Sequence, residues 1–63
     1  MNKAVNYITL FCASGTNNYV QYMMLQAGNA QEAEAKVKGI KPDAKIILHY
    51  AGTSVADAFA QLN

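Results

Sequence analysis

The sequence of 63 residues has a single cysteine and no arginine. One cysteine excludes a disulfide within the chain, and Cys12 with His49, the only histidine, cannot close a zinc site alone. Arginine is the usual residue at phosphate contacts and interface hot spots, so its absence removes a common signature of both. Five lysines against four carboxylates leave a net charge of +1, neither the basic surplus of a typical nucleic-acid-binding domain nor the acidic balance of a DNA mimic. We therefore expect no metal and no cofactor.

The chain also lacks an apolar run of about 18 residues, the length needed to span a bilayer. Met1-Asn2-Lys3 leads straight into strand-like sequence, without a separate apolar signal segment and cleavage site. With the lone cysteine, these absences predict a cytoplasmic protein in a reducing setting. The length predicts a single domain over residues 1–63, of a size that buries only about 60% of the surface its unfolded chain exposes. Small scaffolds usually compensate for such limited burial with disulfides, metal or oligomerisation. In this chain the first two are not supported, so oligomerisation is the expected means.

Three segments are predicted to be strands. Residues 4–13 are rich in β-branched and aromatic side chains. Residues 19–27 follow at hairpin distance after a turn cluster at 14–18, so the pair is expected to be antiparallel. Residues 46–50 form a short apolar run of the kind found in buried strands, and a turn follows at 51–53.

The first of two expected helices spans about residues 30–38. Asn29 is a favourable N-cap, Gly39 fits the C-terminal stop, and Pro42 prevents the helix from resuming. The side chains expected to face inward are Ala30, Ala33 and Val37. Ion pairs in the favourable Glu-to-Lys direction are expected at Glu32–Lys36 and Glu34–Lys38.

The second helix is expected to begin after Ser54, which with Asp57 suggests an N-cap. Its apolar stripe is Val55, Ala58, Phe59 and Leu62. The predicted order of elements is therefore β-β-α-β-α.

Both faces of the first two strands are apolar. A sheet covered on one side shows apolar and polar residues in turn, because side chains alternate across a strand. Here one face of the first strand carries Val5, Tyr7, Phe11 and Ala13, and the other carries Ala4, Ile8, Leu10 and Cys12. In the second strand, Val20, Tyr22 and Met24 alternate with Tyr19, Met23 and Leu25. Both faces therefore need a cover.

Two arrangements would provide it. If the second and third strands flank the first, a mixed three-stranded sheet is expected, and both helices can share one face. The other face would then be covered by a second copy of the chain. Alternatively, the helices cover opposite faces, and the chain could be a monomer. The fold class that we expect is α+β, with a three-stranded mixed sheet, one or two helices packed on it, and dimerisation through the sheet.

Cys12 and His49 are the only candidate nucleophile and base, and a thiol–imidazole dyad is conceivable if their strands are neighbours. Against it, buried free cysteine usually behaves as a small hydrophobe, and no pattern supplies an oxyanion hole. The carboxylates are explained by ion pairs, a turn and a first helical turn. We therefore predict no catalytic residue and no enzyme.

Two candidate binding surfaces remain. Methionine adapts to irregular partners and tyrosine is enriched at interfaces, so the partner-binding candidate is the set Tyr19, Tyr22, Met23 and Met24. A plainer interpretation is that one methionine packs in the monomer core and the other in a homodimer. The alternative, nucleic-acid-binding candidate is the set Lys36, Lys38, Lys41 and Lys45, with strand tyrosines as stacking platforms. Lysines at a helix C-terminus also have a structural explanation, because they complement the helix dipole.

These patterns predict a non-enzymatic interaction module, a homodimer that binds and regulates or sterically inhibits another macromolecule. The alternative is a small nucleic-acid-binding dimer that uses the lysines and tyrosines. In size and lack of catalytic residues the chain is similar in style to small accessory proteins of phages and plasmids, many of which occlude a larger host protein. That resemblance is one of type and rests on no motif.

Overall fold

The computed structural model describes residues 4–12 and 19–62, and it contains three strands and two helices. In chain order these are β1 (Val5–Cys12), β2 (Val20–Ala27), α1 (Ala30–Ile40), β3 (Lys45–Ala51) and α2 (Val55–Ala60). The α+β class is confirmed. The turn predicted at 14–18 lies outside the described residues.

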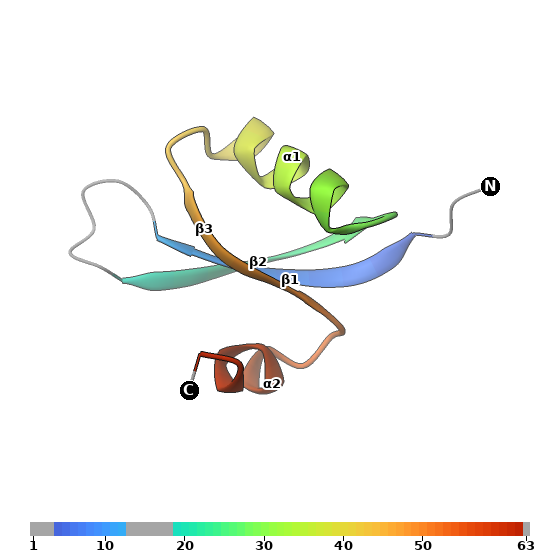
Figure 1. Ribbon diagram of the computed structural model, residues 1–63, viewed down its shortest axis with the longest axis vertical. Helices are drawn as coiled ribbons and strands as arrows, with labels where there is room; N and C mark the ends of the chain where they lie inside the picture. The colour runs from blue at the N-terminus through green and yellow to red at the C-terminus, as the bar shows by residue number, and fades with distance from the viewer. Residues whose placement is uncertain (1–3, 13–18, 63) are drawn as a thin grey trace.

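The sheet is antiparallel, and the prediction of a mixed sheet is wrong. β1 lies in the centre, with β2 on one side and β3 on the other, and it pairs antiparallel with both. β2 and β3 do run in the same direction, as the crossover through α1 requires, but β1 separates them (Figure 1). No parallel ladder therefore forms among the described strands.

The two helices lie on opposite faces of the sheet (Figure 1). On the α1 face, Phe11 packs with Val37 of α1 and Ala44. On the α2 face, Ile8 and Leu10 pack with Ala58 of α2. Because neighbouring residues of β1 point to opposite faces, each helix covers one of the two apolar rows. The chain's own helices thus bury both faces of its central strand, so a second copy is not needed for that purpose.

Local signals set the start of α1, and a proline sets its end. The Asn29 side chain accepts a hydrogen bond from the Glu32 backbone N–H at 2.8 Å, as predicted for the N-cap. The helix continues through Gly39, the predicted stop, and its C-cap is Lys41. Lys41 precedes Pro42, and steric clash with the proline ring disfavours helical backbone at that position. The proline therefore ends the helix two residues later than the glycine suggested.

The buried face of α1 is narrower than the sequence indicated. Ala33 and Val37 are buried, as expected, whereas Ala30 is exposed in the first turn. The two expected ion pairs are present on the solvent side, with Lys36 Nζ 3.5 Å from Glu32 Oε1 and Lys38 Nζ 3.7 Å from Glu34 Oε2. Exposed pairs of this kind contribute only about 0.3–0.5 kcal/mol each.

α2 is short, and the turn before it needs a glycine. Ser54 Oγ accepts from the Asp57 N–H at 3.2 Å, which confirms the predicted cap. Gly52 has φ +155°, and a Cβ there would lie 2.8 Å from Cε2 of the Tyr50 ring. The helix ends at Ala60, so Leu62 lies beyond it and is 41% exposed. α2 therefore covers its face of the sheet less completely than α1 does.

Candidate interaction surface

The largest exposed apolar side chains of the sheet lie along β2. Tyr22 is 50% exposed and Met24 is 53% exposed, although both stand on the face that α2 covers. Their register partners on β1, Leu10 and Ile8, are fully buried. Helix α2, only six residues long, thus shields the central strand and leaves the neighbouring edge strand half open. We call Tyr22 and Met24 together the β2 apolar surface.

Phe59 of α2 supports one end of this surface. The rings of Tyr22 and Phe59 meet edge to face, with their centroids 6.2 Å apart and an interplanar angle of 85°. Phe59 also packs against the cluster formed by Ile8, Leu10 and Ala58. An aromatic pair of this geometry contributes about 0.5–1.5 kcal/mol beyond its buried area, so it holds the Tyr22 ring in a defined orientation.

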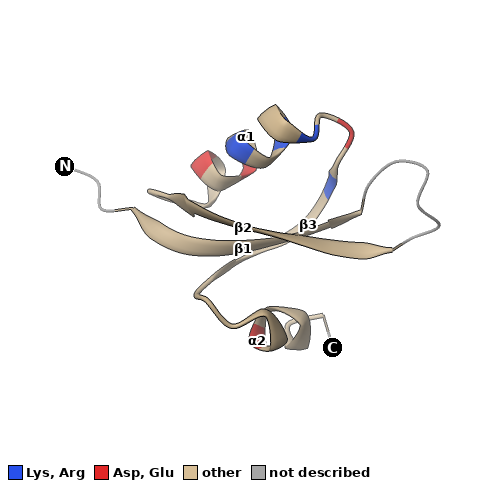
Figure 2. Ribbon diagram, turned by 180° about the vertical axis from the view of Figure 1, so that it is seen from behind, with Lys and Arg blue, Asp and Glu red and all other residues tan. Residues whose placement is uncertain are grey.

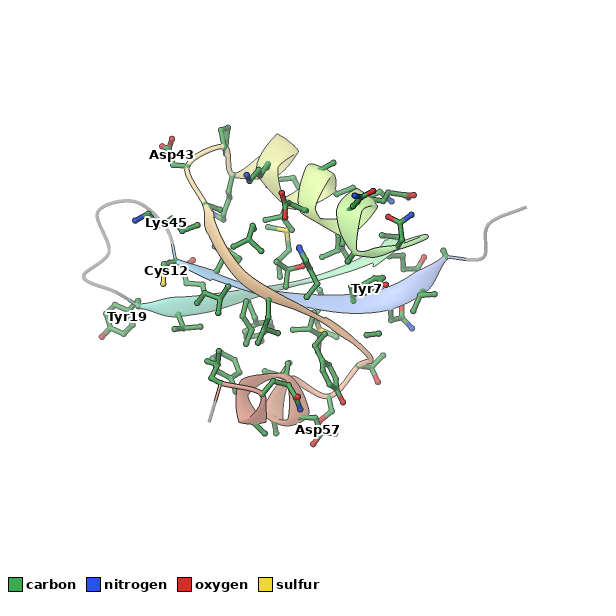
Figure 3. All side chains as sticks on the ribbon, in the orientation of Figure 1. Tyr7, Cys12, Tyr19, Asp43, Lys45 and Asp57 are labelled. Atoms are coloured by element: carbon green, nitrogen blue, oxygen red, sulfur yellow. The ribbon has the colours of Figure 1, made fainter. Side chains whose placement is uncertain are left out.

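The four residues predicted to bind a partner do not form one surface. Met23 lies on the α1 face, where it packs against the cluster of Phe11, Val37 and Ala44. Tyr19 lies just before β2, is 72% exposed, and projects from that end of the sheet (Figure 3). Because side chains alternate along a strand, Met23 and Met24 cannot serve the same face. Only Tyr22 and Met24 stand side by side on one exposed face.

The charged residues gather on the other side of the molecule. Among the described residues, the lysines and all carboxylates but one belong to α1, to the segment between α1 and β3, and to the first residue of β3 (Figure 2). Asp57 is the exception, on α2, and β2 carries no charge at all. The described charged side chains therefore do not surround the β2 apolar surface with charges of one sign.

The lysines predicted for nucleic acid divide into two kinds. Lys36 and Lys38 are paired with Glu32 and Glu34, as described above. Lys41 and Lys45 lie on either side of Pro42-Asp43-Ala44, and within the described residues neither has a carboxylate within 4.0 Å. The interleaved carboxylates reduce the positive potential of this region, which leaves it a weak electrostatic site for a phosphate backbone.

A buried polar contact links β1, β3 and α1. Thr9 is fully buried, and its Oγ1 lies 2.8 Å from Nδ1 of His49, the residue opposite it in the register. Nε2 of His49 lies 3.6 Å from Oε1 of Glu34, a distance too long for a hydrogen bond. In the tautomer that directs Nε2–H toward Glu34, the Thr9 hydroxyl donates to Nδ1. The register between β1 and β3 brings Thr9 and His49 together over 40 residues, a contact that no local pattern indicated.

The order hydroxyl, imidazole, carboxylate has the form of a catalytic triad, yet its hydroxyl is not placed for catalysis. A nucleophile must reach its substrate, and Thr9 has no exposed surface. Cys12, three residues along β1, points to the opposite face from Thr9 and His49, so the conceivable thiol–imidazole dyad is not assembled. The structure assigns Thr9 and His49 to the packing of α1 on the sheet.

Replacing Thr9 with valine should lower the free energy of unfolding by about 1–3 kcal/mol, because the shape is kept while the His49 ring loses its hydrogen-bond partner. Urea unfolding followed by circular dichroism measures the change. Thr9→Ser retains the hydroxyl and should lose much less. A Thr9→Val variant as stable as the unmodified chain, or a larger loss in Thr9→Ser than in Thr9→Val, would contradict a stabilising role for this hydrogen bond.

No group of three or more His, Cys, Asp or Glu side chains in residues 4–12 and 19–62 is placed to hold a metal ion. Neither helix in that part of the chain is long and apolar enough to cross a membrane. No family model, curated protein or solved structure matches the chain.

Proposed function

We propose that this chain is a non-enzymatic protein-interaction module that works as a homodimer and regulates or sterically inhibits a larger partner. The observation that carries the proposal is the β2 apolar surface, in which Tyr22 and Met24 are half exposed on a strand without charge. Tyrosine and methionine are enriched at protein interfaces, and here the pair lies beside an α2 helix too short to cover it. A surface of this composition suits an apolar protein partner rather than a phosphate backbone.

The small size of the domain supports self-association. At 63 residues the domain has a thin stability margin, and binding that is specific to the folded state adds to that margin by mass action. Burying half of a large side chain on each copy contributes on the order of 1 kcal/mol at about 25 cal/mol per Å². Two such side chains on each of two copies would therefore offset part of the cost of association.

Light scattering over a range of concentrations should show the molar mass rising above the 6.8 kDa of one chain toward twice that value. Tyr22→Ala and Met24→Ala should each weaken self-association by about tenfold, because each removes apolar contact area from both copies. The matched control is Ile40→Ala, which truncates a side chain that is 68% exposed on α1, across the sheet from the β2 apolar surface. A monomer at every concentration, or an equal loss in the control, would contradict the proposal.

The same samples distinguish the alternative function. A nucleic-acid-binding dimer should bind a labelled single-stranded oligonucleotide, should lose affinity steeply as salt is raised, and should respond to Lys41→Glu and Lys45→Glu. We expect no such binding at physiological salt, and self-association that depends only weakly on salt. Salt-sensitive oligonucleotide binding that the lysine variants abolish would favour the alternative.

A further inference from the structure

The outer edge of β2 presents unpaired backbone groups. Asn6 of β1 accepts a hydrogen bond from Gly52 N–H at 2.8 Å, so its carbonyl points toward β3. The N–H and C=O of one strand residue point to the same side, and that side alternates along the strand. The odd-numbered residues of β1 therefore bond to β2, and in the continuous β1–β2 register their partners are also odd-numbered. The even-numbered residues of β2 direct their N–H and C=O groups outward: Val20, Tyr22, Met24 and Gln26.

One end of this edge is already occupied. The Lys36 ammonium donates to the backbone carbonyl of Gln26 at 2.7 Å, which agrees with an outward-pointing carbonyl at that position. Lys36 thereby closes the Gln26 end of the strand to an incoming backbone. Val20, Tyr22 and Met24 remain as three successive outward-pointing residues, with Tyr22 in the middle.

β2 lacks the features that protect edge strands from pairing, whereas the opposite edge has them. Charged side chains, proline and bulges are the usual protection. β3 begins with Lys45 and carries a register shift opposite Leu10 and Phe11 that leaves Ile47 without a partner in β1. β2 has eight residues without a charge or a proline, and it pairs with β1 without a shift. Of the two edge strands, β2 is therefore the one that is open to pairing with another strand.

We propose that the β2 edge pairs antiparallel with the same edge of a second copy, with the two-fold axis at Tyr22. The proposal rests on the homodimer of the proposed function and identifies its interface. In this register Tyr22 pairs with the second copy's Tyr22, and Met24 pairs with the second copy's Val20. All three outward residues form hydrogen-bonded pairs with the second copy. Gln26, whose carbonyl accepts from Lys36, lies outside the paired segment. The two sheets become one continuous sheet, and the two β2 apolar surfaces join across the seam.

Charge and side-chain chemistry both favour a second copy as the occupant. Every pair across the seam joins uncharged side chains, and aromatic and β-branched pairs of this kind stabilise antiparallel strands. Gln26 lies four residues from the axis, so at about 3.3 Å per residue the two Gln26 backbones are roughly 26 Å apart. The two Lys36 ammonium groups near them are separated by more than the Debye length of about 8 Å at physiological salt. Among the residues that the structure describes, no like charges therefore oppose the pairing.

Cysteine trapping tests both the edge and the register. In a Cys12→Ser background, Tyr22→Cys should form an intermolecular disulfide under mild oxidation, because paired residues lie about 5.5 Å apart between Cα atoms. Met24→Cys should form far less, since the two Met24 positions are roughly 13 Å apart in the proposed register. Mixing Met24→Cys with Val20→Cys should restore cross-linking. Trapping through Met24→Cys alone, or equal trapping at every position, would overturn the register.

A proline substitution tests the backbone pairing itself. Met24→Pro removes an outward N–H that β1 does not use, whereas Met24→Ala removes the side chain and keeps that N–H. We expect Met24→Pro to stay folded by circular dichroism and to weaken the dimer about tenfold more than Met24→Ala, because two symmetry-related hydrogen bonds are lost. Equal dimer affinities for the two variants would overturn the edge interface.

The outcomes separate this inference from the proposed function. A doubled molar mass with no trapping at Tyr22 and no proline effect would overturn the edge interface and leave a homodimer of another kind. A monomer at all concentrations would overturn both. A doubled mass with trapping at Tyr22 and a selective proline effect would establish the β2 seam.

Discussion

Replacing Ala58 with glutamate should abolish the packing of α2 on the sheet. Ala58 has no exposed surface and lies against Ile8 and Leu10 of the central strand. A carboxylate placed there has no room and no cationic partner among the described residues packed around it. Burying one unpaired ion costs several kcal/mol, which is comparable to the whole stability of a small domain. We therefore expect α2 to leave the sheet or the chain to unfold.

Chemical unfolding and binding of a hydrophobic dye measure this effect together. Loss of the α2 cover exposes Ile8 and Leu10, so dye fluorescence should rise in Ala58→Glu even where secondary structure survives. The control is Ala60→Glu, which introduces the same charge into the same helix at an exposed position. Ala60→Glu should change the unfolding free energy by less than about 0.5 kcal/mol. Equal behaviour of the two variants would contradict the assignment of α2 to this face.

Replacing Phe11 with alanine should destabilise the opposite face by about 3–5 kcal/mol, the usual cost of removing a buried aromatic side chain. Phe11 is 1% exposed and is the largest fully buried side chain among the described residues. It lies between β1 and α1, in contact with the cluster that includes Val37 and Ala44. Its removal leaves a cavity that the small neighbour Ala44 cannot fill.

Urea unfolding of Phe11→Ala, with Phe11→Leu as an intermediate, measures the cost of that cavity. The leucine variant should recover a large part of the lost free energy, because it refills much of the volume. Tyr19→Ala is the aromatic control, since Tyr19 is 72% exposed and belongs to neither core cluster. A loss below about 1 kcal/mol in Phe11→Ala would show that α1 does not depend on this contact.

Much of the candidate surface could be read from alternation alone. Tyr22 and Met24 must share a face, and Met23 must oppose them, whatever the fold. Alternation does not say which face is open, because both rows of β2 are apolar. The length and placement of the two helices decide which face of β2 is open. α1 has eleven residues and covers Met23, whereas α2 has six and leaves Tyr22 and Met24 half exposed.

Two expectations from the sequence differ from the structure, for different reasons. Glycine favours a C-terminal stop, so the sequence predicts that α1 stops at Gly39. The helix instead continues to Ile40 and ends there, because Pro42 disfavours helical backbone at the preceding residue, Lys41. The expected sheet had the second and third strands on either side of the first, and β2 and β3 do flank β1. The description of that sheet as mixed is wrong, because two parallel strands separated by an antiparallel one form no parallel ladder.

The sequence by itself determined the elements, their caps at Asn29 and Ser54, and the two apolar rows of the strands. These features depend on residues within a few positions of one another, where steric and hydrogen-bonding preferences act directly. Only the tertiary structure decided that the helices take opposite faces, that Thr9 meets His49, and that the backbone of Val20, Tyr22 and Met24 faces outward. Those outcomes depend on strand order and register, which arise from contacts between distant segments and leave no local signal in the chain.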